Sequence, residues 1–327
     1  MGDEDRPVVA VDLGATTTRV ALFGTGGTIL AWNSSPTPSS GDSPDVIIRN
    51  LAGLIGNLLS AAPGSSPAGI GISAAGPIDH RHGSIVRPPN LPFEEIPLAD
   101  PLGEEFGLPV RLVNDCHAGV LGEVVFGAGA GCPDLVYITL STGIGGGVVS
   151  NGRLVLGRDG NAAEIGHFHV DSCWNLPCGC GGTGHWEGYS SGRFIPRFFS
   201  AWCRSEGKDP GGIDASSAAG IFGAAGKGDR VALGFMEALG KINGRAVSDV
   251  IVAYDPSCII LDGSVVLRNE DLVLPYLLPH VDRFLPLPGI RLTALDGLAP
   301  LYGASILARG YDTPIGPLLP GSHPGKL

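Results

Sequence analysis

The sequence predicts an α/β protein built from two halves of similar topology. Three observations support this prediction. Short apolar runs of strand length alternate with longer segments of helical spacing, and several of these runs end in glycine-rich turns. A pattern of strand, glycine turn, strand and turn also occurs twice, beginning at Val8 and again at Leu135, 127 residues later. We therefore expect two similar halves facing each other across a cleft.

The individual elements follow from apolar spacing and turn residues. In the first half we expect strands over 8–13, 19–23, 69–74 and 109–113, a hairpin turn over 24–27, a surface loop over 33–45 and a helix over 46–59. In the second half we expect strands over 135–140, 148–149 and 258–261, a turn at 151–152 and helices over 231–252 and 301–309. The Pro/Gly-rich tail from Tyr311 onward is expected to be loosely held.

Length and composition fit this organisation. A chain of 327 residues is long enough for about two domains, and its 43% hydrophobic content suffices for buried cores. We expect a small domain from residues 1–115 with about 302–327, and a large domain from residues 116–301.

Charge and hydropathy disfavour two classes of partner. The net charge is −11 and the chain has no Lys/Arg cluster, so nucleic acids and anionic membranes are not expected as partners. The chain has no apolar run of about 18 residues, as a membrane-spanning helix would require. Its acidic first residues lack the layout of a secretory signal, and we therefore expect a cytoplasmic protein.

Two glycine-rich turns have the composition of phosphate cradles. Glycine lets backbone N–H groups approach phosphate oxygens closely. The segment DLGATTT at 12–18 adds three hydroxyls and a carboxylate, Asp12, that is suited to hold Mg²⁺ directly or through water. The segment STGIGGG at 141–147 is the second cradle. Each alone is better explained as an ordinary glycine-rich hairpin; their occurrence at matching places in the repeat favours phosphate binding.

Asp115 follows an expected strand over 109–113, and the carboxyl ends of strands are where α/β folds place ligands. Phosphoryl transfer to an alcohol needs a group that orients the hydroxyl and accepts its proton, which a carboxylate can do. The alternative is that Asn114 and Asp115 simply cap a helix. Further polar groups suited to sugar hydroxyls are Asn90, Glu164, His167 and Glu187; each also reads as a solvated surface residue.

A cluster of thiol and imidazole groups predicts a structural zinc site. His167, Cys178, Cys180 and His185 lie within 19 residues, and such ligands suit tetrahedral Zn²⁺. Four protein ligands would close the coordination shell. The alternative is two free thiols in a glycine-rich loop, and His169 and Cys173 are substitute ligands. The four remaining cysteines are expected to be small buried residues: Cys116, Cys132, Cys203 and Cys258.

Taken together, these motifs resemble those of the ROK family, which comprises repressors, uncharacterised open reading frames and sugar kinases. The matching segments, in the family's order, are DLGAT at 12–16, AGPID at 75–79, NLP at 90–92, ND at 114–115, STGIGGG at 141–147, EIGH at 164–167 and CGCGGTGHWE at 178–187. The resemblance covers roughly residues 8–309. It implies the actin-like ATPase (ribonuclease H-like) fold of hexokinases, with two domains closing over sugar and ATP.

The resemblance also assigns roles to residues. It implies Asp115 as the catalytic base. The implied sugar contacts are Gly76, Asn90, Asn114, Asp115, Glu164, His167 and Glu187. The implied nucleotide contacts are Gly14, Thr16, Thr17, Thr142, Gly143, Asp262 and Gly263. His167 would touch the sugar through one ring nitrogen and zinc through the other. The family suggests a homodimer.

One position departs from the family pattern, because His185 stands where a third cysteine is usual; histidine is also a good zinc ligand. Repressor members carry an N-terminal helix-turn-helix, and the first strand here begins too early to leave room for one. We therefore predict an ATP-dependent kinase that phosphorylates the 6-hydroxyl of a hexose, with glucose as the first choice. N-acetylmannosamine or N-acetylglucosamine kinase is the alternative, and fructokinase or a non-catalytic sugar-sensing regulator is less favoured.

Overall fold

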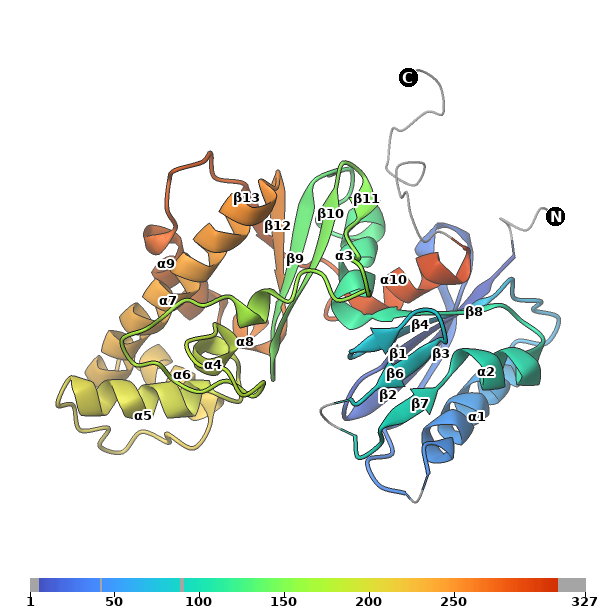
Figure 1. Cartoon of the computed structure of the whole chain (residues 1–327), viewed down its shortest axis with the longest axis horizontal. Coiled ribbons are helices and arrows are strands. Elements are labelled where there is room, and N and C mark those ends of the chain that lie inside the picture. Colours follow the sequence, from blue (N-terminus) through green and yellow to red (C-terminus); the bar gives the residue numbers. More distant parts are fainter. Residues whose placement is uncertain (1–5, 42, 89–90, 311–327) are drawn as a thin grey trace. The chain divides into compact units, whose positions relative to one another are not determined.

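Two five-stranded sheets with the same strand order form the framework of the chain (Figure 1). The computed structural model describes residues 6–41, 43–88 and 91–310. The first sheet has the order β3 (Ile29–Pro36), β2 (Thr17–Phe23), β1 (Val8–Leu13), β4 (Ile70–Ala74) and β8 (Val110–Asn114). The second has the order β11 (Arg153–Leu154), β10 (Ile144–Ser150), β9 (Leu135–Leu140), β12 (Cys258–Asp262) and β13 (Gly289–Leu292).

The corresponding strand pairs of the two sheets also run in the same directions. In the first sheet β2 pairs antiparallel with both β1 and β3, and β4 pairs parallel with both β1 and β8. In the second sheet β10 and β11 are antiparallel, while β12 and β13 are parallel. The internal repeat predicted from the segments beginning at Val8 and Leu135 is therefore confirmed in the strand order.

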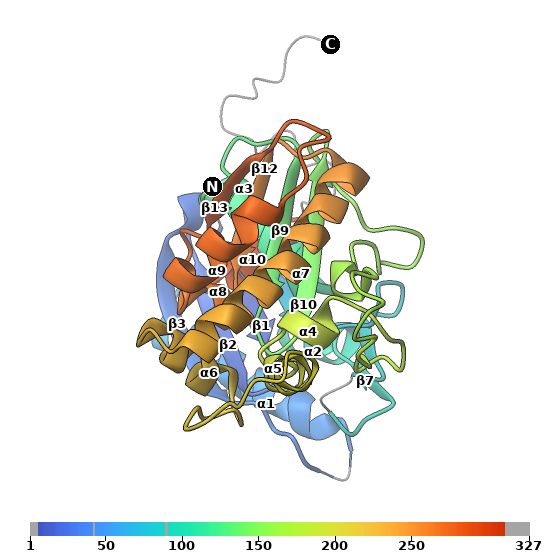
Figure 2. The ribbon, with the colours of Figure 1, turned by 90° about the vertical axis from the view of Figure 1, so that its left-hand side faces the viewer.

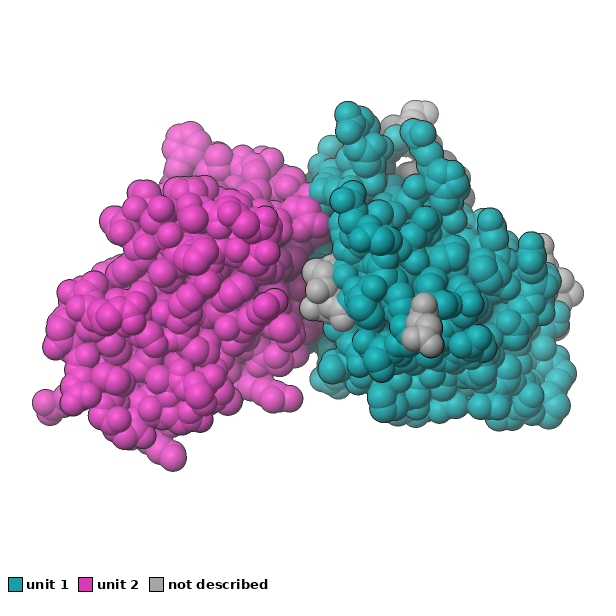
Figure 3. All heavy atoms as spheres, turned by 60° about the horizontal axis from the view of Figure 1, so that its bottom comes forward, with its two compact units in different colours: residues 1–135, 147–162, 293–327 teal, residues 136–146, 163–292 magenta. Residues whose placement is uncertain are grey.

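Residue contacts divide the chain into two compact units, coloured separately in Figure 3. Unit 1 contains residues 1–135, 147–162 and 293–327, and unit 2 contains residues 136–146 and 163–292. The chain therefore crosses between the units within β9 and again within β10. The predicted domains, residues 1–115 with about 302–327 and residues 116–301, remain a prediction.

Helices cover both faces of the first sheet in unit 1. Alternate residues of β1 point to opposite faces: Val9 and Val11 join the core beneath α1 (Asp45–Ala61), while Val8 and Ala10 pack near α10 (Ala299–Ala308). α3 (Asp115–Phe126) packs along α10. Glycine allows α10 to come this close, because a Cβ on Gly71 of β4 would overlap a carbonyl of α10.

The rest of unit 1 is a small sheet and a short helix. The small sheet has the order β5 (Ile78–Asp79), β6 (Ser84–Val86) and β7 (Glu95–Pro97), with antiparallel pairs. α2 (Ala99–Phe106) follows β7 and ends at Gly107, which has a left-handed backbone with φ of 64°. The turn between β2 and β3 contains the short 3₁₀ helix η2 (Thr25–Gly27).

Unit 2 is mainly helical outside its sheet (Figure 2). Its long helix α7 (Arg230–Tyr254) begins at Asp229, whose carboxylate accepts hydrogen bonds from two backbone amides of the first turn. α7 packs against α6 (Ala218–Gly226) and α9 (Glu270–Leu277). The shorter elements are η3 (Ile165–His167), α4 (Glu187–Ser190), α8 (Ser264–Leu267) and η4 (Leu278–His280), and α5 (Ile195–Ser205) follows α4. Aromatic rings of α4, α5 and α7 fill the core: Tyr189, Phe198, Phe199, Trp202 and Phe235.

Most predicted elements are confirmed, and three predictions need correction. The surface loop predicted over 33–45 is wrong in its first part, because β3 continues to Pro36 and pairs with β2 along its polar end. The glycine turn predicted over 141–147 is shorter, because β10 begins at Ile144. Cys132 is half-buried rather than buried; the other three cysteines predicted to be buried are so. The predicted loose tail from Tyr311 lies outside the described residues.

Within the described ranges, no helix combines the length and the apolar character needed to span a membrane.

Candidate active site and metal centre

The candidate catalytic residue Asp115 begins α3 directly after β8 ends. Asn114 is the N-cap, and its side-chain oxygen accepts a hydrogen bond from the amide of Cys116 at 2.8 Å. Asp115 Oδ1 accepts from the same amide at 2.9 Å. The helix-cap alternative is thus realised by Asn114, which leaves Asp115 in the first turn, where the helix dipole favours a negative charge.

The surroundings of Asp115 make its carboxylate more basic than usual. Burial raises its pKa, and the hydrogen bond from the Cys116 amide opposes that rise. A carboxylate with a raised pKa accepts a proton more readily, as a general base requires. Gly76, a predicted sugar contact, lies beside the cap, because a Cβ on it would be 3.2 Å from Asn114 Nδ2. Asn90, another predicted contact, lies outside the described residues.

Asp12 stands near the end of β1, in the sheet whose strand β8 leads directly into Asp115. Its side chain is buried, and its Oδ2 accepts a hydrogen bond from Arg19 at 3.0 Å. Burial raises the pKa of Asp12 to about 6, Arg19 opposes this, and the charge of Asp115 adds to it. The charge of Asp115 therefore acts on Asp12, and a cation bound by Asp12 would favour the ionised form of its carboxylate.

The turn after Asp12 is tight and leaves two of its three hydroxyls exposed. The amide of Gly14 donates to the Thr17 carbonyl at 3.1 Å, and a Cβ on Gly14 would lie only 2.8 Å from that oxygen. Thr16 and Thr17 are exposed, as nucleotide contacts would need to be. Thr18 is buried, and its hydroxyl is 2.9 Å from that of Thr37.

Sequence reasoning missed Thr37, which anchors this turn. Its hydroxyl donates to the Gly14 carbonyl at 2.7 Å, and its amide donates to the Thr16 carbonyl at 3.0 Å. Thr37 follows β3 directly, within the segment predicted to be a surface loop, so nothing in its spacing pointed to this role.

In unit 2 the second glycine turn lies beside the turn that ends β12. Ser141 Oγ is 3.5 Å from Ser264 Oγ, and the Ser141 amide donates to the Gly143 carbonyl at 2.9 Å. Gly263 has φ of 98°, in the region that favours glycine, and a Cβ there would overlap the carbonyl of Leu140. The predicted nucleotide residues Thr142, Gly143, Asp262 and Gly263 are therefore brought to one edge of the sheet.

Asp262 has a structural task that the sequence did not reveal. Its Oδ2 accepts from the Tyr137 hydroxyl at 2.8 Å, and its Oδ1 accepts from the Gly263 amide at 2.6 Å. With both carboxylate oxygens engaged and the side chain buried, Asp262 shapes the turn. A contact with nucleotide at this turn would therefore come most readily from backbone groups.

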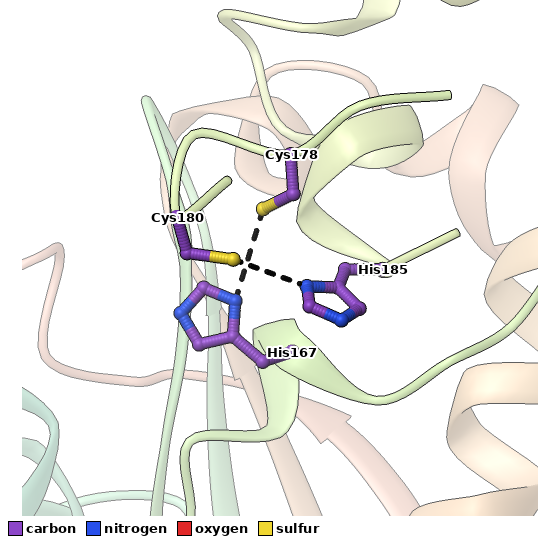
Figure 4. A group of neighbouring side chains, drawn as sticks. All are labelled: His167, Cys178, Cys180 and His185. Carbon is purple, nitrogen blue, oxygen red and sulfur yellow. Dashed lines mark hydrogen bonds between the residues drawn. The ribbon is translucent and has the colours of Figure 1, made fainter. Parts of the chain in front are cut away.

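The four predicted metal ligands converge in unit 2 (Figure 4). The ligand atoms of His167, Cys178, Cys180 and His185 all lie within 4.8 Å of one another. Cys178 Sγ is 3.8 Å from His167 Nδ1, and Cys180 Sγ is 3.3 Å from His185 Nδ1. The alternative ligands His169 and Cys173 are not members of this group.

These distances fit the shell of a tetrahedral zinc ion. Zinc–sulfur bonds of about 2.3 Å and zinc–nitrogen bonds of about 2.0 Å place neighbouring ligand atoms about 3.5 Å apart. The two sulfur–nitrogen distances, 3.8 and 3.3 Å, bracket that value. Burial raises the pKa of the Cys178 thiol to about 11, so a bound cation would have to favour the thiolate there.

The predicted sugar contacts of unit 2 adjoin this metal group. While His167 Nδ1 faces Cys178, its Nε2 lies 4.0 Å from a carboxylate oxygen of Glu164. Glu187 Oε1 lies 3.7 Å from Cys178 Sγ, and its Oε2 accepts from the amide of Ile144 at 3.0 Å. The carboxylate of Glu187 therefore joins the metal group to the second glycine turn, a link that the sequence did not predict.

A buried hydrogen bond supports the residues on either side of Trp186. Trp186 is fully buried between His185 and Glu187, and its Nε1 donates to Asn243 of α7 at 2.8 Å. Its amide donates to the carbonyl of Phe168 at 2.9 Å. Since a buried indole N–H needs a hydrogen-bond partner, this bond holds the Trp186 side chain in place. It thereby restrains the backbone that carries His185 and Glu187.

Comparison with known proteins agrees with this arrangement. A glucokinase from Aeropyrum pernix is 38% identical over 288 residues, which cover 85% of this chain and 88% of the relative. An N-acetylmannosamine kinase from Escherichia fergusonii is 34% identical over 269 residues, covering 81% of this chain and 86% of that protein. A ROK family glucokinase from Streptomyces griseus, solved in complex with glucose and AMPPNP, superposes with a TM-score of 0.75 at 31% identity and covers 93% of this chain and 99% of that one.

The sheet order and the superposition on this solved structure give the chain the actin-like ATPase fold. The ROK family model matches residues 8–310, nearly the whole of the described chain, and this protein therefore belongs to the ROK family.

Proposed function

We propose that this protein is a glucokinase, which transfers the γ-phosphoryl group of ATP to the 6-hydroxyl of glucose. The observation that carries the proposal is Asp115, a carboxylate of raised pKa held at the end of β8 by the capped first turn of α3. Two of the three relatives quoted above are named as glucokinases: the one with the highest identity of the three, and the one solved with glucose and AMPPNP.

In this mechanism Asp115 orients the sugar 6-hydroxyl and accepts its proton as the oxygen attacks the γ-phosphorus. The oxygen–phosphorus bond forms while the bond to the β-phosphate oxygen breaks, and ADP leaves. The further proposed sugar contacts are Gly76, Asn90, Asn114, Glu164, His167 and Glu187.

ATP is proposed to be held by backbone and hydroxyl groups of the two glycine turns. Gly14, Thr16 and Thr17 supply the first, and Thr142 and Gly143 supply the second. The turn at Asp262 and Gly263 adds backbone contacts. Mg²⁺ supplies neutralisation of the phosphate charge when it is bound, and Asp12 is the residue that would hold it, directly or through water.

Zinc is proposed as a structural ion in the group of His167, Cys178, Cys180 and His185. The distances among the ligand atoms and the mixture of thiolate and imidazole support this assignment. Four protein ligands leave no open position, so the ion would take no part in the chemistry. Its role would be to fix His167 so that Nε2 is presented to the sugar.

We further propose that the protein acts in the cytoplasm as a homodimer, without nucleic-acid or membrane partners. The cysteine spacing, which suits metal binding better than disulfides, supports the cytoplasm. The net charge of −11 supports the absence of nucleic-acid and membrane partners. The homodimer rests on the family alone.

N-acetylmannosamine kinase is the second candidate, because a relative of that name matches at 34% identity. N-acetylglucosamine and fructose are further acceptors to be tested. A coupled ADP-release assay over glucose, mannose, fructose and both N-acetylhexosamines would decide among them. We expect glucose to give the highest kcat/KM; a preference for an acetylated sugar would replace the proposal with the second candidate.

Asp115→Asn tests the catalytic assignment in the same assay. Removing the base should lower kcat by about 10³-fold or more while glucose still binds, since a general base typically contributes 10²–10⁴-fold. Asp45→Asn is the matched control: Asp45 is exposed and also begins a helix, so the variant should keep full activity. An Asp115→Asn variant with activity near that of the control would reject Asp115 as the base.

A further inference from the structure

His117 is a buried polar residue that the proposed chemistry does not use. It lies in the first turns of α3, two residues after Asp115, and is 1% exposed. Its Nε2 lies 3.1 Å from the carbonyl oxygen of Ala162. Its Nδ1 is also buried and has no hydrogen-bond partner among the described residues.

These contacts define the protonation of the ring. An imidazole nitrogen facing a carbonyl must carry the proton, so Nε2 is the donor and Nδ1 holds an unshared lone pair. Burial lowers the pKa of His117 to about 4, with the nearby His80 adding to the effect. At neutral pH the side chain is therefore uncharged, and its one hydrogen bond among the described residues is to Ala162.

The accepting carbonyl ends a loop that closes on itself. The amide of Ala162 donates to the carbonyl of Leu156 at 3.0 Å, so the two ends of the loop over 156–162 are joined. Gly160, inside the loop, packs against the ring of His80, because a Cβ there would overlap that imidazole. Both backbone polar groups of Ala162 are thus engaged, one within the loop and one with His117.

The residue after Ala162 has an unfavourable backbone conformation. Ala163 has φ of 65°, in the left-handed region that residues with a Cβ seldom adopt. Such residues persist where their surroundings hold them, and they occur frequently at functional sites. Glu164 follows at once, and the amide of His167 donates to its carbonyl at 3.0 Å.

We propose that His117 is a positioning residue for sugar binding: by fixing the Ala162 carbonyl, it sets the path on which the chain enters Glu164 and His167. The inference rests on the proposed function, in which those two side chains contact the sugar. It assigns α3 two tasks, with Asp115 acting on the 6-hydroxyl and His117 acting through the loop.

Two amide variants of different reach test the proposal. In His117→Gln the side-chain amide nitrogen extends about as far as Nε2 and can still donate to Ala162, whereas His117→Asn is too short. We expect His117→Asn to raise the KM for glucose by about tenfold, the size of one lost buried hydrogen bond, with the KM for ATP within twofold of the original. We expect His117→Gln to restore the KM for glucose to within about threefold.

Val120→Ala is the control for simple destabilisation, since Val120 is fully buried on the same helix and its apolar side chain can make no hydrogen bond to the loop. It should lower thermal stability without a selective change in the KM for glucose. If His117→Asn behaves like Val120→Ala, or raises both KM values equally, His117 has only a structural role and the proposal is overturned.

Hydrogen exchange gives a readout that does not depend on activity. In the full-length protein without sugar, amides of a peptide covering 160–167 should exchange about tenfold faster in His117→Asn than in the unmodified chain or in Val120→Ala. Unchanged exchange would overturn the anchor itself. If the unmodified protein neither binds nor phosphorylates glucose, the proposed function fails, and the exchange comparison still decides whether His117 holds the loop.

Discussion

The depressed pKa of His117 predicts how the stability of the protein depends on pH. A histidine in an unfolded chain titrates near 6.5, whereas burial lowers the pKa of His117 to about 4 in the folded protein. Below pH 6.5 the unfolded chain binds a proton that the folded chain does not. The contribution of His117 is therefore fully present above pH 6.5 and is lost as the pH falls toward 4.

The magnitude follows from the two pKa values. Lowering the pH from 7 to 5 should remove about 2 kcal/mol of unfolding free energy through this one residue. His117→Gln cannot titrate and should therefore lack this loss. The difference between the unmodified protein and the variant isolates His117 from Asp12, whose pKa is raised to about 6 and whose effect on stability has the opposite sign.

Urea unfolding followed by circular dichroism at pH 7, 6 and 5 measures this difference. We expect the unfolding free energies of the two proteins to converge, or to change order, as the pH falls, with a relative change of about 2 kcal/mol. Parallel pH profiles, in which the variant differs by a constant amount, would show that His117 titrates normally in the folded chain. That result would refute the argument from burial and the orphaned Nδ1.

Three further predictions concern metal content and packing. His185→Ala should lower both the bound zinc, measured by elemental analysis, and the thermal stability. The control Cys203→Ala removes a buried thiol outside the metal group and should keep its metal. Equal metal content in the two variants would reject the four-ligand site. Asn243→Leu should leave the Trp186 N–H unpaired, costing about 1–3 kcal/mol of stability and raising the KM for glucose; a variant as stable as the unmodified chain would show that this bond contributes little. Gly71→Ala should lower the unfolding free energy by about 1–3 kcal/mol in urea titrations, because a Cβ there overlaps α10, and an unchanged midpoint would contradict that close contact.

The sequence by itself determined the parts of this protein that depend on neighbours along the chain. Continuous apolar runs correctly predicted the bounds of strands β1 and β9, because a strand that is buried on both faces needs an apolar segment without breaks. The place of Asp115 at a strand end also followed from local pattern. The metal group was predictable because its four ligands lie within 19 residues, so short loops suffice to bring them together.

The polar end of β3 was wrongly predicted to be a loop, because its pairing with a neighbouring strand cannot be seen in its composition. The end of β3, over Asn33–Pro36, reads as a loop by composition, yet it is an edge strand whose hydrogen bonds come from β2. Edge strands tolerate polar residues because one side of the strand and much of its surface meet solvent. The partner strand, not the residues of the segment, therefore decided its structure.

Only the tertiary structure decided which side chains support the candidate site. The bonds of His117 to Ala162, of Glu187 to Ile144, and of Trp186 to Asn243 join residues 45, 43 and 57 positions apart. Each forms because helices and loops pack at particular places, and a linear pattern of residue types carries no record of such distances. The sequence named the candidate catalytic and binding groups, and the packing of the chain determined which residues hold them in position.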